Sequence, residues 1–248
     1  MSVQPSATVN SDTPASMSDE PVLAPISNRA FPLKRVVGGL LAVAIAFTAA
    51  AVLLPKSADA KDAIGLDAAQ KKTVLGIQDN LNAISTMQSR FMQITSQGGF
   101  AKGTFRLQRP GKMRIDYDPP VPVQVISNGL IVMYKDKELD QLSHAPLNTI
   151  PASMFIGENV DFFGEDLLIT DFTHEEGVIR LTLQRSDDPL DGSLTLVFED
   201  KPLALKKWTV IDAQGINTTV SLVAPQFGDT FDPDLFKVET KRMGGAEN

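Results

Sequence analysis

The feature that most constrains the fold is a period of two in the apolar residues, which recurs in several segments between residues 87 and 222. Ile179, Leu181 and Leu183 are one such set, separated by polar residues. Alternate side chains of a β-strand point to one face, so each segment predicts a strand with one apolar and one polar face. Short polar turns join successive segments, whereas parallel strands need long crossovers. The pattern therefore predicts one strongly curved antiparallel sheet.

The predicted strands form two series. The apolar positions of the first series are Phe91, Phe105, Leu107, Met113, Ile115, Tyr117, Val123 and Val125. Those of the second include Leu194, Leu196, Phe198, Trp208, Val210, Val220 and Leu222. In the first series, Asn128-Gly129 predicts a two-residue hairpin, with a return strand from Leu130 to Tyr134. Leu139 and Leu142 indicate a further short strand.

Two helices are predicted beside the sheet. The first follows Asp67, a favourable N-cap with Gln70 three residues later as in a capping box, and carries an apolar stripe of Val74, Ile77, Leu81 and Ile84. The second is a short amphipathic helix at Thr149–Ile156, between the two series of strands. It is predicted either to be movable or to be an ordinary surface helix. Residues 231–236 predict a turn or a single helical turn.

The N-terminal part has the order of a secretory signal. Residues 1–28 are rich in Ser, Pro, Thr and Asp, a composition typical of disorder. Residues 29–60 contain basic residues, then an apolar run of 19 residues from Val36 to Leu54, then Ala58-Asp59-Ala60. The run is long enough to remain as a membrane anchor, but we favour cleavage after Ala60. Either alternative exports residues 61–248 as one domain.

Composition excludes several classes of function. Four of the 30 acidic and four of the 23 basic residues lie in residues 1–60, so the exported part has 26 and 19 and holds the whole net charge of −7. Such a domain repels phosphate backbones, so we expect no nucleic-acid partner. The chain has no cysteine, which excludes disulfides, thiolate metal sites and cysteine nucleophiles.

A catalytic set is not expected. The two histidines, His144 and His174, fall in predicted turns, and neither a G-x-S-x-G nor an H-E-x-x-H motif occurs. The acidic pairs Glu175-Glu176 and Asp187-Asp188 lie beside turn residues and are expected to be solvated. We therefore predict a protein that is not an enzyme, with no metal and no cofactor.

Arg109 is the polar residue that stands out. It shares strand parity with Phe105 and Leu107, so in a regular strand its guanidinium lies on the apolar face, where a charge is costly unless it is paired. Alternatively, the strand ends before Pro110 and the side chain turns to solvent. The residues alone leave both possibilities open.

Several motifs together resemble the LolA-type lipoprotein carrier family. They are Phe91-Met92-Gln93, the segment from Gly103 through Arg109-Pro110 to Arg114, Pro119-Pro120, Ile126-Ser127-Asn128-Gly129, Tyr134 and Gln141. The resemblance extends from about the first helix to Phe236 and so covers most of the exported domain. It implies a mainly β fold, in which an unclosed half-barrel has its N-terminal and mid-chain helices across the concave apolar side.

The resemblance also implies a function. Such carriers are periplasmic monomers that shield the acyl chains of lipoproteins. They receive these from an inner-membrane transporter and pass them to an outer-membrane acceptor or the membrane itself. The implied cavity residues are Phe91, Phe105, Leu107, Met113, Ile115, Tyr117, Val125, Ile150 and Met154, and Arg109 is implied to contact the covering helices.

One departure affects the cargo more than the fold. Met113 occupies a position where the family often has an aromatic residue, which gives a softer apolar face. The alternative function is a binding module of the same fold for another lipid or glycolipid, either soluble or anchored by Val36–Leu54.

Overall fold

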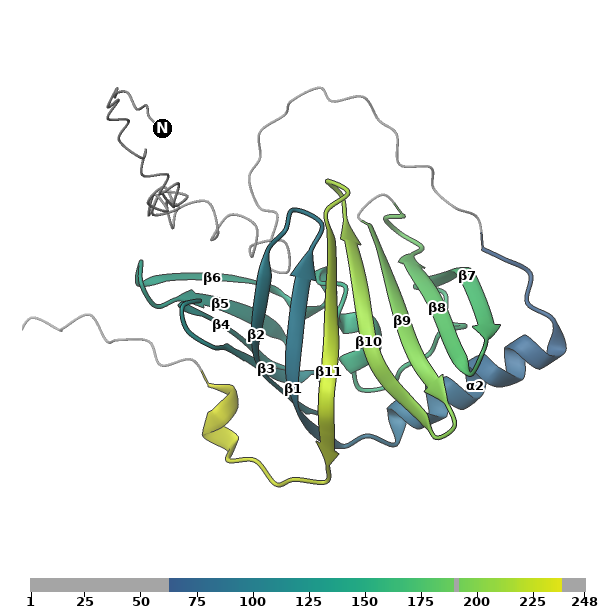
Figure 1. The fold of residues 1–248 in the computed structure, drawn as a ribbon, viewed down its shortest axis with the longest axis horizontal. Coiled ribbons are helices and arrows are strands. Elements are labelled where there is room, and N and C mark those ends of the chain that lie inside the picture. The colour runs from purple at the N-terminus through teal and green to yellow at the C-terminus, as the bar shows by residue number, and fades with distance from the viewer. Residues whose placement is uncertain (1–62, 190–191, 238–248) are drawn as a thin grey trace, which may run out of the picture. The chain divides into compact units, whose positions relative to one another are not determined.

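The computed structural model describes residues 63–189 and 192–237, and their fold is dominated by one sheet of 11 strands (Figure 1). The strands are β1 (Thr86–Thr95), β2 (Phe100–Gln108), β3 (Lys112–Tyr117), β4 (Val123–Asn128), β5 (Ile131–Asp136), β6 (Gln141–Pro146), β7 (Leu167–Glu175), β8 (Val178–Arg185), β9 (Gly192–Asp200), β10 (Leu203–Asp212) and β11 (Asn217–Phe227). The prediction of a mainly β fold is confirmed.

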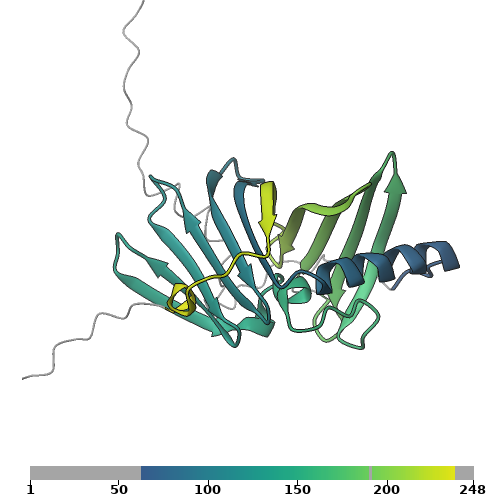
Figure 2. The same cartoon turned by 90° about the horizontal axis from the view of Figure 1, so that it is seen from below.

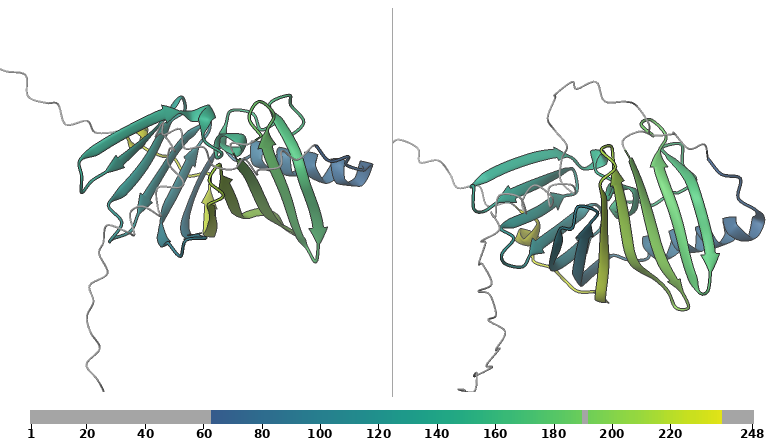
Figure 3. Two further views of the ribbon diagram at one scale, coloured as in Figure 1. Left: turned by 90° about the horizontal axis from the view of Figure 1, so that it is seen from above. Right: turned by 45° about the horizontal axis from the view of Figure 1, so that its top comes forward.

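The strands follow the order β6-β5-β4-β3-β2-β1-β11-β10-β9-β8-β7, and every neighbouring pair is antiparallel. The first strand pairs with the last, for example Phe91 with Leu222, so two meanders join in the middle of the sheet. The sheet curves strongly, and β6 and β7 form its two ends (Figure 3). This is the predicted unclosed antiparallel half-barrel.

The N-terminal helix α2 (Ala68–Asn82) begins as predicted. Asp67 Oδ1 accepts from the backbone N–H of Gln70 at 2.8 Å, and Gln70 Oε1 accepts from that of Asp67 at 2.9 Å, which completes the capping box. Val74, Ile77 and Leu81 are buried, so the apolar stripe faces the core. Figure 2 shows α2 crossing the half of the sheet that contains β7 to β10.

The mid-chain segment corrects the prediction of one helix at Thr149–Ile156. It forms two separate pieces, the 3-10 turn η2 (Leu147–Thr149) and the helix α3 (Ser153–Ile156). Between them Ile150 is extended, with φ −102° and ψ 143°. The reason is Pro151, whose ring disfavours helical geometry in the residue before it. Near the C-terminus, Pro233–Phe236 forms the predicted single helical turn, η3.

Three further sequence predictions were wrong in detail. The hairpin between β4 and β5 turns at residues 129–130, not at Asn128-Gly129, because Asn128 stays in the strand while its side-chain oxygen accepts from two backbone N–H groups of the turn. Leu139 lies in a turn before β6. His144 and His174 lie in strands β6 and β7, not in turns.

The sheet separates an apolar face from a polar one. The inner, concave face carries the buried core of the domain, and the outer face of β1 to β4 carries Arg90, Arg106 and Arg114. In residues 63–189 and 192–237, no helix is long and apolar enough to cross a membrane. The predicted disordered segment 1–28 and the signal-like segment 29–60 lie outside the described residues.

Candidate functional site: an apolar inner face covered by α3

The nine residues that the sequence analysis placed on a lipid-binding face lie in one apolar cluster. Six of them are buried core residues: Phe91, Phe105, Leu107, Met113, Ile115 and Val125. The other three, Tyr117, Ile150 and Met154, are partly buried and pack against that core. Six strand positions supply one face because the alternation keeps their side chains on the same side of β1 to β4.

Two aromatic residues that the sequence analysis did not assign to the site complete its centre. Trp208 of β10 contacts Phe105 of β2, with ring centroids 5.4 Å apart, and Phe155 of α3, with centroids 5.3 Å apart. The side chain of Phe155 is 1% exposed, so α3 inserts a ring into the inner face instead of lying on its surface. The parity of Trp208 with Val210 was the sequence signal for its inward direction.

The carboxyl end of α3 is held by the turn between β2 and β3. Helix ends leave backbone carbonyls without intrahelical partners. Arg109 Nη2 donates to the carbonyl of Phe155 at 2.7 Å, the Gly111 N–H donates to that of Ile156 at 3.0 Å, and Arg109 Nη1 donates to that of Gly157. Three successive backbone carbonyls therefore accept hydrogen bonds from the β2–β3 turn. Together, α3 and the segment that follows it are called the cover below.

Arg109 also binds the end of the N-terminal helix region. Its Nε donates to the carbonyl of Ile84 at 3.0 Å, two residues beyond α2. The strand β2 ends at Gln108, as one alternative proposed, yet the guanidinium turns to these carbonyls and not to solvent. Partial burial lowers the pKa of Arg109 from its usual value, but an arginine stays charged in proteins. A charge in that position needs such acceptors.

The segment after α3 is attached to α2 by side-chain amides. Asn82 forms a reciprocal pair with the backbone of Val160: its Nδ2 donates to the carbonyl at 3.0 Å, and its Oδ1 accepts from the N–H at 2.8 Å. Gln78 Oε1 accepts from the N–H of Phe162 at 3.0 Å. The cover is thus bound at one end to the β2–β3 turn and at the other to α2.

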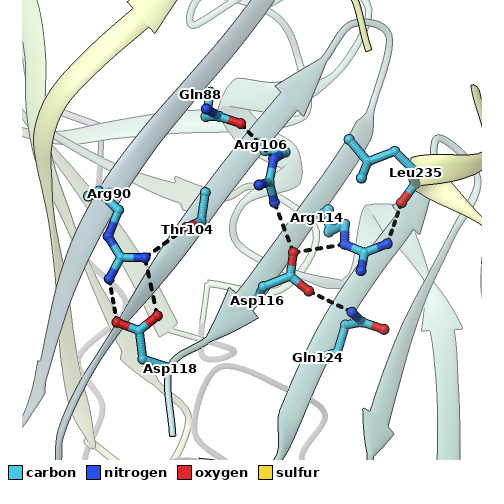
Figure 4. Close-up of polar contacts among 9 residues, drawn as sticks. All are labelled: Gln88, Arg90, Thr104, Arg106, Arg114, Asp116, Asp118, Gln124 and Leu235. Atoms are coloured by element: carbon cyan, nitrogen blue, oxygen red, sulfur yellow. Dashed lines mark hydrogen bonds and ion pairs between the residues drawn. The ribbon is translucent and has the colours of Figure 1, made fainter. Parts of the chain in front are cut away.

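The outer face opposite this site carries a polar network (Figure 4). Asp116 accepts from Arg106 at 2.9 Å, from Arg114 at 2.8 Å and from Gln124 at 2.6 Å. Burial opposes ionisation of Asp116, but these bonds outweigh it and lower the pKa of that carboxyl. Arg114 also donates to the carbonyl of Leu235 at 2.8 Å, which ties η3 to this face.

The histidines and acidic residues are dispersed. His174 Nε2 of β7 lies 3.2 Å from Asp200 Oδ2 of β9, and His144 lies on the end strand β6. Across the described ranges 63–189 and 192–237, no three or more His, Asp or Glu residues are grouped so that they could hold a metal ion.

Comparison with known proteins agrees with this architecture. The family described as "Outer membrane lipoprotein carrier protein LolA" matches residues 82–239. A protein named outer-membrane lipoprotein carrier protein from Halorhodospira halophila is 26% identical over 185 residues, covering 71% of this chain and 86% of the relative. One of the same name from Pseudomonas syringae is 26% identical over 216 residues, covering 83% and 95%. One from Methylococcus capsulatus is 29% identical over 167 residues, covering 63% and 78%. The chain therefore belongs to the LolA family of outer-membrane lipoprotein carrier proteins.

Proposed function

We propose that this protein is a periplasmic carrier that shields the acyl chains of lipoproteins against its inner face. In this proposal it receives them from an inner-membrane transporter and delivers them to an outer-membrane acceptor or to the outer membrane itself. The observation that carries the proposal is the attachment of α3: a short helix covers an apolar face and is held there by carbonyl bonds to Arg109 and Gly111. Membership of the LolA family supports it.

A lipoprotein carrier must compensate a large free energy of exposing acyl chains to water. An acyl chain of ~16 carbons has on the order of 12 kcal/mol of apolar transfer free energy, at ~0.8 kcal/mol per methylene. A lipoprotein with such chains does not cross water unaided at a useful rate. The inner face of the sheet offers an apolar surface of the right chemistry, and its aliphatic and methionine side chains can adapt to a flexible chain.

Loading must exchange contacts within the site. Phe105, Trp208 and Phe155 pack against each other in the structure, so an acyl chain that reaches the centre of the inner face has to displace Phe155 and with it α3. Displacement breaks the bonds to Arg109 and Gly111. Their re-formation favours release, so the carrier holds its cargo less tightly than the apolar surface alone would allow.

Trp208 provides the test, because it is the single tryptophan of the chain and lies at the centre of the site. A synthetic triacylated cysteinyl peptide with bromine atoms along its palmitoyl chains is added to the purified protein, since bromine quenches tryptophan emission on contact. We expect strong quenching by the brominated lipopeptide and none by a water-soluble brominated acid of equal concentration. Bound lipopeptide without quenching would place the acyl chains elsewhere and contradict the proposed site.

The alternative function differs in anchoring. We propose that residues 29–60 are a signal peptide that is removed after Ala60, which leaves residues 61–248 free to shuttle. A binding module for another lipid or glycolipid could instead keep Val36–Leu54 in the membrane. The N-terminal residue of the protein isolated from cells separates the two: Lys61 in the periplasmic fraction supports a shuttle, and an intact run in the membrane fraction supports the module.

A further inference from the structure

The inner face carries a small group of polar side chains that the proposed site does not use. Gln93 of β1 is 1% exposed, and its inward-facing neighbours on that strand are Phe91 and Thr95. Its Oε1 accepts from the hydroxyl of Tyr117 at 2.8 Å. Within the described residues its Nε2, which carries two N–H donors, has no hydrogen-bond partner.

Two hydroxyl groups on the same inner face are in the same condition. Thr218 of β11 is 1% exposed, and the pairing of Thr95 with Thr218 and of Gln93 with Val220 makes it a diagonal neighbour of Gln93 on the inner face. Tyr134 of β5 lies on the same face further along the sheet, because it pairs with Val125 of β4, which in turn pairs with Ile115 of β3. In the described part of the chain, neither the Thr218 nor the Tyr134 hydroxyl has a partner.

This condition is costly for the empty protein. A buried donor without an acceptor loses its bonds to water and gains none in return. Leucine, phenylalanine and valine have similar shapes to glutamine, tyrosine and threonine and would remove that cost. The four polar groups therefore have no stabilising role in this conformation beyond the one Tyr117–Gln93 bond, which indicates that they serve a bound molecule.

The chemistry of these four side chains indicates which kind of ligand they bind. All four side chains are neutral, and the atoms without a partner are mainly N–H and O–H donors. They therefore suit a ligand with neutral oxygen acceptors. A phosphate would instead be bound by cationic side chains. Gln93 pairs across the sheet with Ala101, eight residues along β2 from Arg109, or about 26 Å at ~3.3 Å per residue. The polar group and the Arg109 attachment thus lie toward opposite ends of β2.

We propose that Gln93, Tyr117, Tyr134 and Thr218 form a subsite for the carbonyl oxygens of the cargo's acyl linkages. The inference rests on the proposed function and deepens it. The glyceryl ester carbonyls accept from these donors, and the acyl tails extend from there toward Phe105 and Trp208. The same carbonyl chemistry occurs in lipoproteins and in membrane phospholipids, so both are tested.

The test compares lipids that differ only in their carbonyls. Binding of the full-length protein is measured for a palmitoylated diacylglyceryl cysteinyl peptide and for the same peptide with ether links in place of both glyceryl esters. Dipalmitoyl phosphatidylethanolamine and its diether form provide the phospholipid arm. We expect the wild-type protein to bind the ester form at least about fivefold more tightly than the ether form, as one or two neutral hydrogen bonds predict. A preference in only one arm identifies the source of the cargo.

Variants then test whether the preference for the ester form comes from these polar side chains. Gln93→Leu, Tyr134→Phe and Thr218→Val should each weaken binding of the ester form by roughly fivefold and leave the ether form unchanged. Tyr134→Phe and Thr218→Val should also unfold at an equal or higher urea concentration without lipid, because they remove unpaired buried groups. Gln93→Leu is left out of this comparison because it also removes the acceptor of the Tyr117 hydroxyl. Thr219→Val is the matched control: this hydroxyl lies on the outer face, 2.9 Å from that of Thr209, and its loss should not alter lipid preference.

The outcomes separate the two proposals. Equal wild-type affinity for ester and ether forms would overturn the carbonyl subsite and leave the carrier function standing. Absence of binding to either form of either lipid would overturn the carrier function and the subsite with it. The wild-type comparison decides the matter even where a variant fails to fold.

Discussion

Replacing Arg109 by leucine tests how the cover is held. The substitution removes the bonds to the carbonyls of Ile84, Phe155 and Gly157 while it adds apolar surface to the inner face. Hydrogen bonds from charged donors contribute ~1.5–3 kcal/mol each when fully protected, and we assign about 1 kcal/mol to each because Arg109 is only partly buried. Apolar contacts of the new side chain offset part of the loss. Opening of α3 breaks the bonds to Phe155 and Gly157 but not the bond to Ile84, so the net effect on opening is about 1–2 kcal/mol, or about 5- to 30-fold in the opening equilibrium.

Hydrogen exchange measures this directly. The amides of Phe155 and Ile156 donate to the carbonyl of Ala152 at 3.1 Å each, so their exchange reports on α3. We expect it to be faster in Arg109→Leu by the factor above, and unchanged in Arg106→Leu, a control on the outer face of β2, the strand that Arg109 follows.

In a two-stage transfer assay, loading of Arg109→Leu should persist and delivery should fall, with lipoprotein accumulating on the carrier. Delivery at the wild-type rate together with unchanged exchange would refute the role of Arg109 as a latch. Arg109→Lys keeps the charge but lacks the planar fork that reaches several carbonyls, so it should resemble the leucine variant in exchange.

Three further predictions concern stability. Phe155→Ala should lower the free energy of unfolding in urea by about 3 kcal/mol and shift Trp208 emission to the red; an unchanged spectrum would show that the two rings are not in contact. Asp67→Ala should cost about 1 kcal/mol in the same titration through loss of the capping box, and no loss would mean that α2 is held by packing alone. The pKa of Asp116 is lowered in the folded state, so its contribution to stability is present above the unfolded pKa of about 4 and is lost as pH falls below that value. Asp116→Asn should therefore flatten the decline in stability between about pH 5 and 3. An equally steep decline in both proteins would contradict this.

Local patterns were sufficient to predict most of the sheet, because each strand with one buried face must alternate. The capping box at Asp67 was also readable, since it depends on residues three apart. In contrast, β7 was missed. The pairing of β7 with β8 shifts between Ile169 and Asp171, and this irregularity interrupts the alternation by which a strand is recognised.

The site was predictable only in part, for a related reason. Strand parity placed Phe105 and Leu107 on one face, and the same parity indicated Arg109. The partners of its guanidinium lie 25 residues before it and 46 and 48 residues after it, so no local pattern identifies them. The break at Ile150 was visible in principle as the residue before Pro151, but the apolar spacing around it suggested a continuous helix.

The two ends of the inner face differ in a way that bears on affinity. At one end Arg109 has its carbonyl partners only while α3 is closed, so loading costs those bonds. At the other end Gln93 Nε2 and the Thr218 hydroxyl have no hydrogen-bond partner among the described residues, so in our proposal loading supplies theirs. One set of bonds is thus exchanged for another as the acyl chains replace Phe155. Because the polar terms then oppose each other, the affinity depends largely on the difference between two apolar packings, and this difference is much smaller than the transfer free energy of the acyl chains from water. That condition lets a protein bind a strongly apolar cargo and still release it.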